Sequence, residues 1–427
     1  MKNLKNSGIE WLGEIPEHWE IVLTRYCFDE YNTRCNQNEY PLLSVTISNG
    51  VIYQNDIVNK KDISNDDKSN YKIVPVGAIT YNKMRMWQGA VGVNMLEKGI
   101  VSPAYCVAVS NELIIAKFSF YLFRSKRMIY NFGKNSYGLC LDMNNLRYED
   151  FQNIKIPLPP LKEQEQIANF LDEKCEKIQN FIEKKEKLLS LLQEQKQALI
   201  NETITKGLDK NVKLKNSGIE WLGEIPEHWE MVRLANFGIF LKGNGISRQD
   251  LIEDGEPAIH YGDIYTKYEI STTALKSRIS TETAQNITSI HNGDILFAGS
   301  GETKEDIGKN IVYLGKEKAF AGGDVIIFRQ KKNNALFLSY ALNTKYVKSL
   351  KGIDSKGEII VHIYASNLKD IKIPIPPLKE QEQIANFLDE KCEKIDSLIT
   401  KIKKQIELIK EYKTTLINEA VCGRMDL

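Results

Sequence analysis

Two long stretches of this chain occur twice, and no other feature constrains its fold as strongly. LKNSGIEWLGEIPEHWE occupies positions 4–20 and recurs unchanged at 214–230. IKIPLPPLKEQEQIANFLDEKCEKI occupies 154–178 and recurs at 371–395 with one substitution. The two pairs are offset by 210 and 217 residues, so the region between the repeated segments is seven residues longer in the second repeat. The chain is therefore predicted to contain two long repeats, each made of a motif, a variable region and a helix.

The regions between the repeated segments are unlike each other. Residues 21–153 and 231–370 share almost no similarity over their first hundred residues. Drift after duplication is one explanation, but drift alone would not leave the flanks identical. We therefore expect the identical segments to form the scaffold and its partner contacts, and the variable regions to recognise different targets. A chain of 427 residues has room for two such domains and their connections.

Each variable region mixes strand and helix patterns. YKIVPVGAITYNKM and GDVIIFRQ are typical of strands, whereas FSFYLFRSKRMIYNFG and ALFLSYALNTKYVKSL are typical of helices ended by a basic turn. The predicted fold class is α+β, with two recognition domains in a pseudo-two-fold repeat. The predicted boundaries are 1–155 for the first domain, 156–210 for the first long helix, 211–372 for the second domain and 373–427 for the second long helix.

A long helix is predicted after each double proline, because proline is tolerated in a first helical turn. Apolar residues recur along each helix with the a/d spacing of a heptad, broken by Lys185, Lys196 and Lys413. The predicted seam is Leu171, Cys175, Ile178, Ile182, Leu189 and Leu192 in the first helix, and Leu388, Cys392, Ile395, Ile399, Ile402, Ile406 and Ile409 in the second. Amphipathic helices on a globular core are the alternative; we expect an antiparallel coiled coil roughly 60 Å long.

Composition limits the possible classes of protein. The net charge is +1, which excludes a uniformly basic nucleic-acid binder but allows local basic surfaces. The N-terminus has no signal-peptide pattern, and no apolar run is long enough to span a membrane. The seven cysteines are scattered, and the five histidines lack ligand spacing. We therefore expect a cytoplasmic protein with free thiols, no metal site and no membrane partner.

Three kinds of sequence pattern could indicate catalysis in this chain. FAGSGETKEDIGKN, at 297–310, is glycine-rich but lacks the Walker spacing, so a surface turn is favoured over a phosphate loop. Asp294, Glu302 and Lys304 match a nuclease arrangement loosely, yet the ExK part lies among glycines and not in a strand. No amino-methyltransferase motif is present. The chain is predicted to catalyse nothing, and a Mg²⁺-dependent nuclease is retained as the alternative.

Basic and amide side chains suggest contacts with double-stranded DNA. NKMRMWQGAVG places donors around a rigid tryptophan, and arginine and glutamine side chains can read guanine and adenine. Basic clusters recur at matching places in FRSKRM and in the second repeat, as expected for phosphate contacts. For each residue alone, an ordinary solvated charge is an equal alternative. The candidate contacts are Lys83, Arg85, Gln88, Arg124, Lys126, Arg127, Lys242, Arg248, Lys304, Lys309, Lys345 and Lys348.

The layout closely resembles the specificity subunit of Type I restriction–modification systems. The resemblance is carried by GIEWLGEIPEHWE before each variable region, IPxPPLKEQEQIANFLDEK at each helix start, and LINETITKGLD and LINEAVCGRMD at the helix ends. NKMRMWQGAVG and SPAY resemble one class of target-recognition domain; GDIYT with GDILFAGSGET resembles another. The second helix end departs from the first, with VCGRMD in place of ITKGLD.

The resemblance implies a DNA-binding subunit without catalysis. Each variable region would read one half of a split, asymmetric DNA site, and the coiled coil would act as a spacer. The repeated segments would bind two methyltransferase subunits, which use S-adenosylmethionine, and restriction subunits that use ATP and Mg²⁺ would join them. No cofactor is expected on this chain itself. A coiled-coil scaffold that does not bind DNA is the structural alternative.

Overall fold

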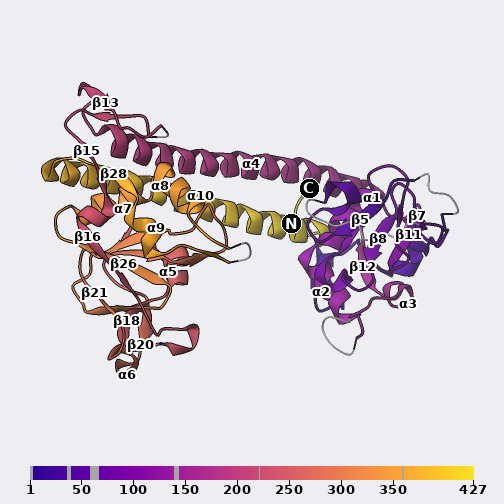
Figure 1. Cartoon of the computed structure of the whole chain (residues 1–427). Coiled ribbons are helices and arrows are strands. Elements are labelled where there is room, and N and C mark those ends of the chain that lie inside the picture. Colours follow the sequence, from indigo (N-terminus) through magenta and orange to yellow (C-terminus); the bar gives the residue numbers. More distant parts are fainter. Residues whose placement is uncertain (1–2, 36–39, 58–66, 139–143, 221, 358–359) are drawn as a thin grey trace. The chain divides into compact units, whose positions relative to one another are not determined.

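The structure, a computed structural model, describes residues 3–35, 40–57, 67–138, 144–220, 222–357 and 360–427. The chain forms two compact units: unit 1 comprises residues 1–186 and 403–427, and unit 2 comprises residues 187–402. Each unit combines helices with small, mostly antiparallel sheets, so the predicted α+β class is confirmed (Figure 1).

Unit 1 contains a four-stranded sheet in the order β4-β11-β8-β9 and several two-stranded sheets. Its strands are β1 (Leu4–Asn6), β2 (Glu14–Pro16), β3 (Glu20–Leu23), β4 (Phe28–Glu30), β5 (Leu43–Thr46), β6 (Gly50–Tyr53), β7 (Lys72–Val74), β8 (Ile79–Asn82), β9 (Val91–Val93), β10 (Gly99–Val101), β11 (Tyr105–Ser110) and β12 (Lys155–Leu158). Its shorter helices are α1 (Ala116–Arg124), α2 (Lys126–Lys134) and α3 (Tyr148–Phe151). The core behind the sheet is aromatic, formed by Phe28, Phe123, Phe132 and Phe151.

Unit 2 contains two five-stranded sheets, β16-β26-β22-β24-β19 and β17-β20-β18-β25-β21. Its strands are β13 (Leu214–Asn216), β14 (Glu224–Pro226), β15 (Glu230–Arg233), β16 (Gly238–Lys242), β17 (Leu251–Ile252), β18 (Glu256–Ile259), β19 (Ser271–Thr272), β20 (Ser277–Ile279), β21 (Ser289–Ile290), β22 (Ile295–Ala298), β23 (Ser300–Gly301), β24 (Asn310–Tyr313), β25 (Ala319–Ala321), β26 (Val325–Gln330), β27 (Val361–His362) and β28 (Lys372–Ile375). Its shorter helices are α5 (Tyr261–Thr266), α6 (Thr281–Ala284), α7 (Ala335–Leu342), α8 (Lys345–Ile353) and α9 (Ala365–Lys369).

The two variable regions share one sheet topology although their sequences are unrelated. The order β4-β11-β8-β9 in unit 1 corresponds to β16-β26-β22-β24 in unit 2, strand for strand along the chain. In both units two consecutive helices follow the sheet, α1 and α2 in the first and α7 and α8 in the second. The sequence predicts one helical stretch at each of these places; each is in fact two helices. The break occurs because Ser125 and Thr344 cap the second helix of each pair with their hydroxyl groups.

The identical segments of each repeat pack on each other at the edge of the variable region. β3 pairs with β12, and β15 pairs with β28. In each unit, the strand at the start of the variable region thus pairs with the strand that follows the region. Trp19 is 1% exposed, and its indole nitrogen donates to Glu163 over 2.9 Å. Trp229 is fully buried and donates to Glu380 over 3.2 Å in the same manner. Identity at these buried positions is therefore explained by a shared scaffold.

A buried glutamine extends this scaffold into each variable region. Gln164 donates to the carbonyls of Leu113 and Pro159, and its own amide oxygen accepts the N–H of Ile115. Gln381 repeats the pattern in unit 2, where it accepts the N–H of Asn334. One amide side chain thus fixes the loop before the helix pair in each unit, and truncating it would leave several buried groups unpaired.

Two long helices, α4 (Leu161–Lys206) and α10 (Leu378–Val421), start directly after the double prolines. Within unit 2, Lys196 of α4 pairs with Asp396 of α10 at 2.7 Å. Within unit 1, Glu186 of α4 lies 3.8 Å from Lys410 of α10. Figure 1 shows the helices side by side in each unit, and their antiparallel pairing agrees with the prediction. Among the described helices, none is long and apolar enough to cross a membrane.

Every predicted seam residue is covered at least in part. The buried ones are Leu171, Ile178, Ile182, Leu388, Cys392, Ile399, Ile402 and Ile406. The half-buried ones are Cys175, Leu189, Leu192, Ile395 and Ile409. The Lys196 side chain interrupts the seam, and its ion pair with Asp396 occurs in unit 2 only, since Gln179 stands at the position of Asp396 in the first repeat. A polar pair at a seam position fixes the register of two helices.

Candidate nucleic-acid interface

The same hairpin loop of the shared sheet carries the candidate reading residues in both units. In unit 1 the loop 83–90, KMRMWQGA, joins β8 to β9. In unit 2 the loop 302–309, ETKEDIGK, leads to β24 from β23, which follows β22 after one residue, Gly299, and pairs with β27. Counted from the equivalent strands β8 and β22, the first loop (83–90) has eight residues and the second (299–309) has eleven. Both have a left-handed glycine next to their last residue, Gly89 and Gly308, and their other residues differ. Two segments of unlike sequence therefore occupy equivalent places in two matching folds.

The first hairpin, defined as residues 83–90, presents polar side chains from a rigid turn. Arg85 and Gln88 are exposed, whereas Met86 between them is fully buried and anchors the loop. The indole nitrogen of the half-buried Trp87 donates to the Met84 carbonyl over 3.1 Å. The turn closes at a left-handed glycine, Gly89, with φ 94°, a conformation that other residues rarely adopt.

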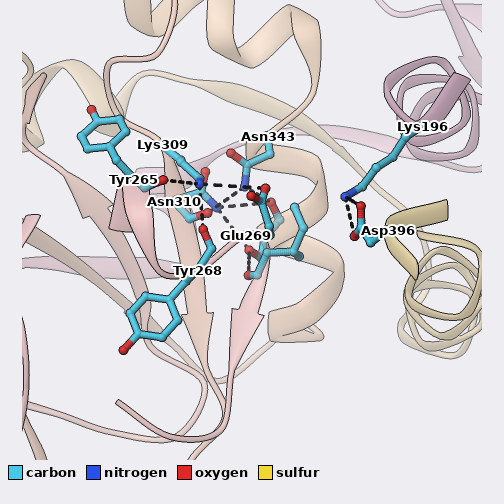
Figure 2. Close-up of polar contacts among 10 residues, drawn as sticks. Lys196, Tyr265, Tyr268, Glu269, Lys309, Asn310, Asn343 and Asp396 are labelled. Atoms are coloured by element: carbon cyan, nitrogen blue, oxygen red, sulfur yellow. Dashed lines mark hydrogen bonds and ion pairs between the residues drawn. The ribbon is translucent and has the colours of Figure 1, made fainter. Parts of the chain in front are cut away.

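The second hairpin, defined as residues 302–309, is held at its base by lysine (Figure 2). Glu302, Thr303 and Lys304 are exposed at its start. The Lys309 ammonium lies at its end and donates to the carbonyl of Tyr268 over 2.7 Å and more weakly to that of Tyr265. Burial lowers the pKa of Lys309 from its ordinary value. This ammonium is bonded to carbonyls inside the domain, so the contacts of Lys309 favour a structural role over the predicted DNA contact.

Two predicted arginine contacts are likewise engaged inside unit 1. Arg124 donates to the carbonyls of Val91, Ile47 and Ser48. Arg127 donates to the Trp11 carbonyl over 3.1 Å, and its guanidinium lies 3.7 Å from a carboxylate oxygen of Glu419. These guanidinium groups connect parts of the scaffold within unit 1. Their contacts therefore favour a structural role over the predicted phosphate contact.

The remaining candidates lie at the surface to different extents. Lys126 and Lys345 are both exposed and form the first residue of equivalent helices, α2 and α8. Lys242 is exposed and lines a pocket with Ser300, which lies at the base of the second hairpin. Lys83 and Lys348 are half-buried. The Arg248 side chain lies outside the described part of the structure.

Lys351, on α8, is fully buried beside the second hairpin. Its ammonium donates to the carbonyl of Gly308 over 2.6 Å and to that of Leu342 over 2.9 Å. Burial, and to a lesser extent the charge of Lys348, lowers the pKa of Lys351 to about 7. The sequence shows Lys351 as one more residue of a basic helix, but the structure places it in the interior.

This lowered pKa predicts a dependence of stability on pH. The unfolded chain keeps the ordinary lysine pKa of about 10.4 and so binds more protons than the folded chain between pH 7 and 10. The free energy of unfolding should therefore rise with pH across this window, by about 1 kcal/mol per pH unit. Denaturant unfolding of the wild type, Lys351→Met and the exposed control Lys345→Met measures it. Only Lys351→Met should lose this part of the slope, and an unchanged slope would refute the assignment.

Asp294, one of the two carboxylates of the nuclease alternative, is paired with Arg329. Asp294 is 2% exposed, and both of its oxygens accept hydrogen bonds from the Arg329 guanidinium, at 2.7 Å and 2.9 Å. It precedes β22, whereas Glu302 follows β23 at the far end of the same extended stretch. A metal ion needs convergent, available oxygens. Among the described residues no cluster of three or more His, Cys, Asp or Glu side chains could hold a metal.

Comparisons with known proteins define the class of this chain. Residues 20–191 and 226–408 match the family model described as Type I restriction modification DNA specificity domain. Because these matches cover most of the chain, the protein belongs to this family of DNA specificity domains, one match lying over each repeat. The resemblance inferred from the repeated segments is therefore confirmed.

Curated relatives match the chain over nearly its full length. It is 25% identical to the putative type I restriction enzyme MjaX specificity subunit of Methanocaldococcus jannaschii, covering 99% of this chain and 97% of that protein. It is 27% identical to the MjaVIII specificity subunit of the same organism, covering 96% and 94%. The family relation thus extends across both repeats and both long helices.

Solved structures agree with the fold. A chain from a study of complex assembly and conformational transition of the type I R-M system matches with a TM-score of 0.71 at 18% identity, covering 96% of this chain and 99% of that one. The HsdS subunit from Thermoanaerobacter tengcongensis matches with a TM-score of 0.53 at 19% identity, covering 96% and 98%. At these identities the likeness supports the fold alone.

Proposed function

We propose that this chain directs a Type I restriction–modification complex to a split DNA site, with each unit reading one half through its hairpin. The carrying observation is that residues 83–90 and 302–309 occupy the same place in two matching sheets and differ in sequence at every aligned position except the shared glycine, Gly89 and Gly308. Two hairpins with different side chains on the same scaffold are expected to recognise two different base sequences. The two half-sites are therefore different, and the whole site is asymmetric.

The side chains on each hairpin suit base recognition. Arginine can pair with guanine and glutamine with adenine, which gives Arg85 and Gln88 direct roles in the first half. In the second half, Glu302 can accept from cytosine and Lys304 can donate to guanine. Lys126 and Lys345, at matching helix starts, suit phosphate contacts that position each unit on the duplex without reading sequence.

The identical segments are proposed to bind the same partner twice. Sequence identity at buried positions is explained by the shared scaffold. The two repeats are also identical at exposed positions such as Lys162, Glu165 and Gln166, whose equivalents in α10 are exposed as well. An unpaired surface has no folding reason to stay the same. We assign these surfaces to two methyltransferase subunits, which bind S-adenosylmethionine and modify adenine, with restriction subunits using ATP and Mg²⁺ joining them. The chain itself supplies specificity and no catalytic group.

Replacing Arg85 by alanine tests the first reader. We expect discrimination at one base pair of the first half-site to fall by about 1–3 kcal/mol, because a bidentate pair with a base is lost. Competition binding with duplexes substituted at each position measures it, using the complex with its methyltransferase subunits. Lys126→Ala is the matched control: it should weaken binding to all duplexes alike and reduce the salt dependence.

The alternatives give different results in the same assay. Full discrimination by Arg85→Ala at every position of its half would remove this residue from the reading surface. Equal binding of the wild type to all duplexes would favour a scaffold without sequence recognition. Mg²⁺-dependent cleavage by the isolated chain would favour the nuclease alternative.

A further inference from the structure

In both units the junction between the two consecutive helices contacts the first residue of the strand that leaves the hairpin. Arg124 is the last residue of α1, and its guanidinium donates to the carbonyl of Val91, the first residue of β9. Asn343 follows α7 directly, and its amide donates over 2.8 Å to the carbonyl of Asn310, the first residue of β24 (Figure 2). β9 and β24 are the strands that leave the two hairpins. Different side chains at equivalent positions therefore make the same connection.

Unit 2 adds a second connection through Lys351. One ammonium joins the Gly308 carbonyl, at the end of the hairpin, to the Leu342 carbonyl at the end of α7. The side-chain oxygen of Asn310 lies 3.4 Å from the same nitrogen. Three oxygens, from the hairpin, the following strand and the helix junction, thus surround this nitrogen. The hairpin cannot shift relative to the junction without breaking these bonds.

The equivalent helix position in unit 1 shows that the fold itself does not need a lysine there. Lys351 is the seventh residue of α8, and Phe132 is the seventh residue of α2. Both side chains are fully buried. Burying a lysine amino group costs more free energy than burying a phenyl ring, even when carbonyls surround it. A position that accepts phenylalanine in one repeat but holds lysine in the other therefore serves a feature specific to unit 2, and the bonded feature is its hairpin.

A glycine next to Lys351 brings the same helix against the start of the hairpin. A Cβ atom on Gly352 would lie 2.7 Å from the Lys304 carbonyl oxygen, too close for any other residue without a shift. At the other end, Gly308 has φ 70° and needs the left-handed conformation that glycine tolerates. The hairpin is thus fixed at both ends by α8 and its preceding junction, while Glu302, Thr303 and Lys304 remain exposed.

We propose that Lys351 in unit 2 and Arg124 in unit 1 are positioning residues, which hold the reading hairpins in place and so determine base discrimination without touching DNA. This inference rests on the proposed function, because it assumes that the hairpins read bases. Hydrogen bonds to base edges weaken steeply with small changes in distance and angle, so a hairpin that moves loses discrimination before it loses general affinity. The predicted signature is a loss confined to one half-site.

The test uses Lys351→Met, which keeps an unbranched side chain and removes the hydrogen-bond donors of the amino group. The complex with its methyltransferase subunits is bound to the wild-type split duplex, to duplexes substituted within each half, and to unrelated DNA. We expect discrimination within the second half-site to fall roughly tenfold or more, since one base contact is worth about that much. Discrimination within the first half-site and affinity for unrelated DNA should not change.

Three further variants separate positioning from a general loss of structure. Lys351→Gln restores two donors and should recover part of the second-half discrimination. Phe132→Met changes the equivalent position of unit 1, whose phenyl side chain has no hydrogen-bonding group, and should leave discrimination in both halves intact. Arg124→Met should reproduce the loss in the first half only, which keeps the proposal testable if Lys351→Met does not fold.

The outcomes are distinct. Folded Lys351→Met with unchanged discrimination, or with equal loss in both halves, would overturn the positioning role. A wild-type complex that discriminates in neither half would instead overturn the proposed function, whatever the variants do.

Discussion

Inserting one heptad into each long helix is expected to move the two half-sites apart while leaving both sequences unchanged. Seven residues lengthen a helix by about 10 Å, which corresponds to roughly three base pairs along B-DNA. The insertions belong after Leu192 in α4 and after Thr400 in α10, which lie level because Lys196 pairs with Asp396. A whole heptad preserves the seam, so both helices still pack.

Mapping of methylated adenines would show this result directly. The double insertion should abolish methylation at the original spacing and create it at a wider one with the same two halves. Insertion into α4 alone is the control: it mismatches the seam and should leave methylation weak or absent at any spacing. Retention of the original gap by the double-insertion variant would show that these helices do not set the spacing.

The second large effect concerns the buried tryptophan of each scaffold. Trp229→Ala should destabilise unit 2 by about 3–5 kcal/mol, because it leaves a cavity against Ile373 and its neighbours in the same core cluster. It also removes the indole donor to Glu380. A loss of this size is comparable to the whole stability of many domains. We therefore expect the second unit to unfold well before the first.

Limited proteolysis during urea titration distinguishes the two units. Trp229→Ala should expose cleavage sites between residues 214 and 375 first, whereas Trp19→Ala should expose sites before residue 158. Trp87 is half-buried in the first hairpin, so Trp87→Ala serves as the control and should lower the free energy of unfolding much less. Simultaneous unfolding of both units in each variant would show that their stabilities are coupled.

The repeated segments made much of the scaffold predictable. Their identity located both copies, the double prolines located the starts of α4 and α10, and the heptad spacing identified residues such as Leu171 and Ile399, which are buried. Local patterns suffice for such features because periodicity depends only on the chain itself. The common sheet of the two variable regions could not be predicted in this way, since strand order depends on contacts between distant residues.

The candidate site was likewise predictable from the sequence only in part. The exposed positions of Arg85 and Lys304 agree with what the sequence suggests for surface turns. Arg124 and Lys309 are different, because the acceptors that engage them are backbone carbonyls supplied by distant segments. Carbonyls carry no sequence signature, so a charged residue bonded to them resembles any other basic residue. Asn343 was missed for a related reason: it is neutral, and only the helix junction reveals its role.

Sequencing of methylated adenines tests the central claim most directly. The chain would be expressed with its methyltransferase subunit in a host that lacks DNA methylation, and modified adenines would be mapped across the genome. Our account predicts a single asymmetric motif, two defined and unlike halves separated by a fixed unread gap. Methylation without a defined second half, or no methylation by a complex shown to assemble with an active partner, would contradict it.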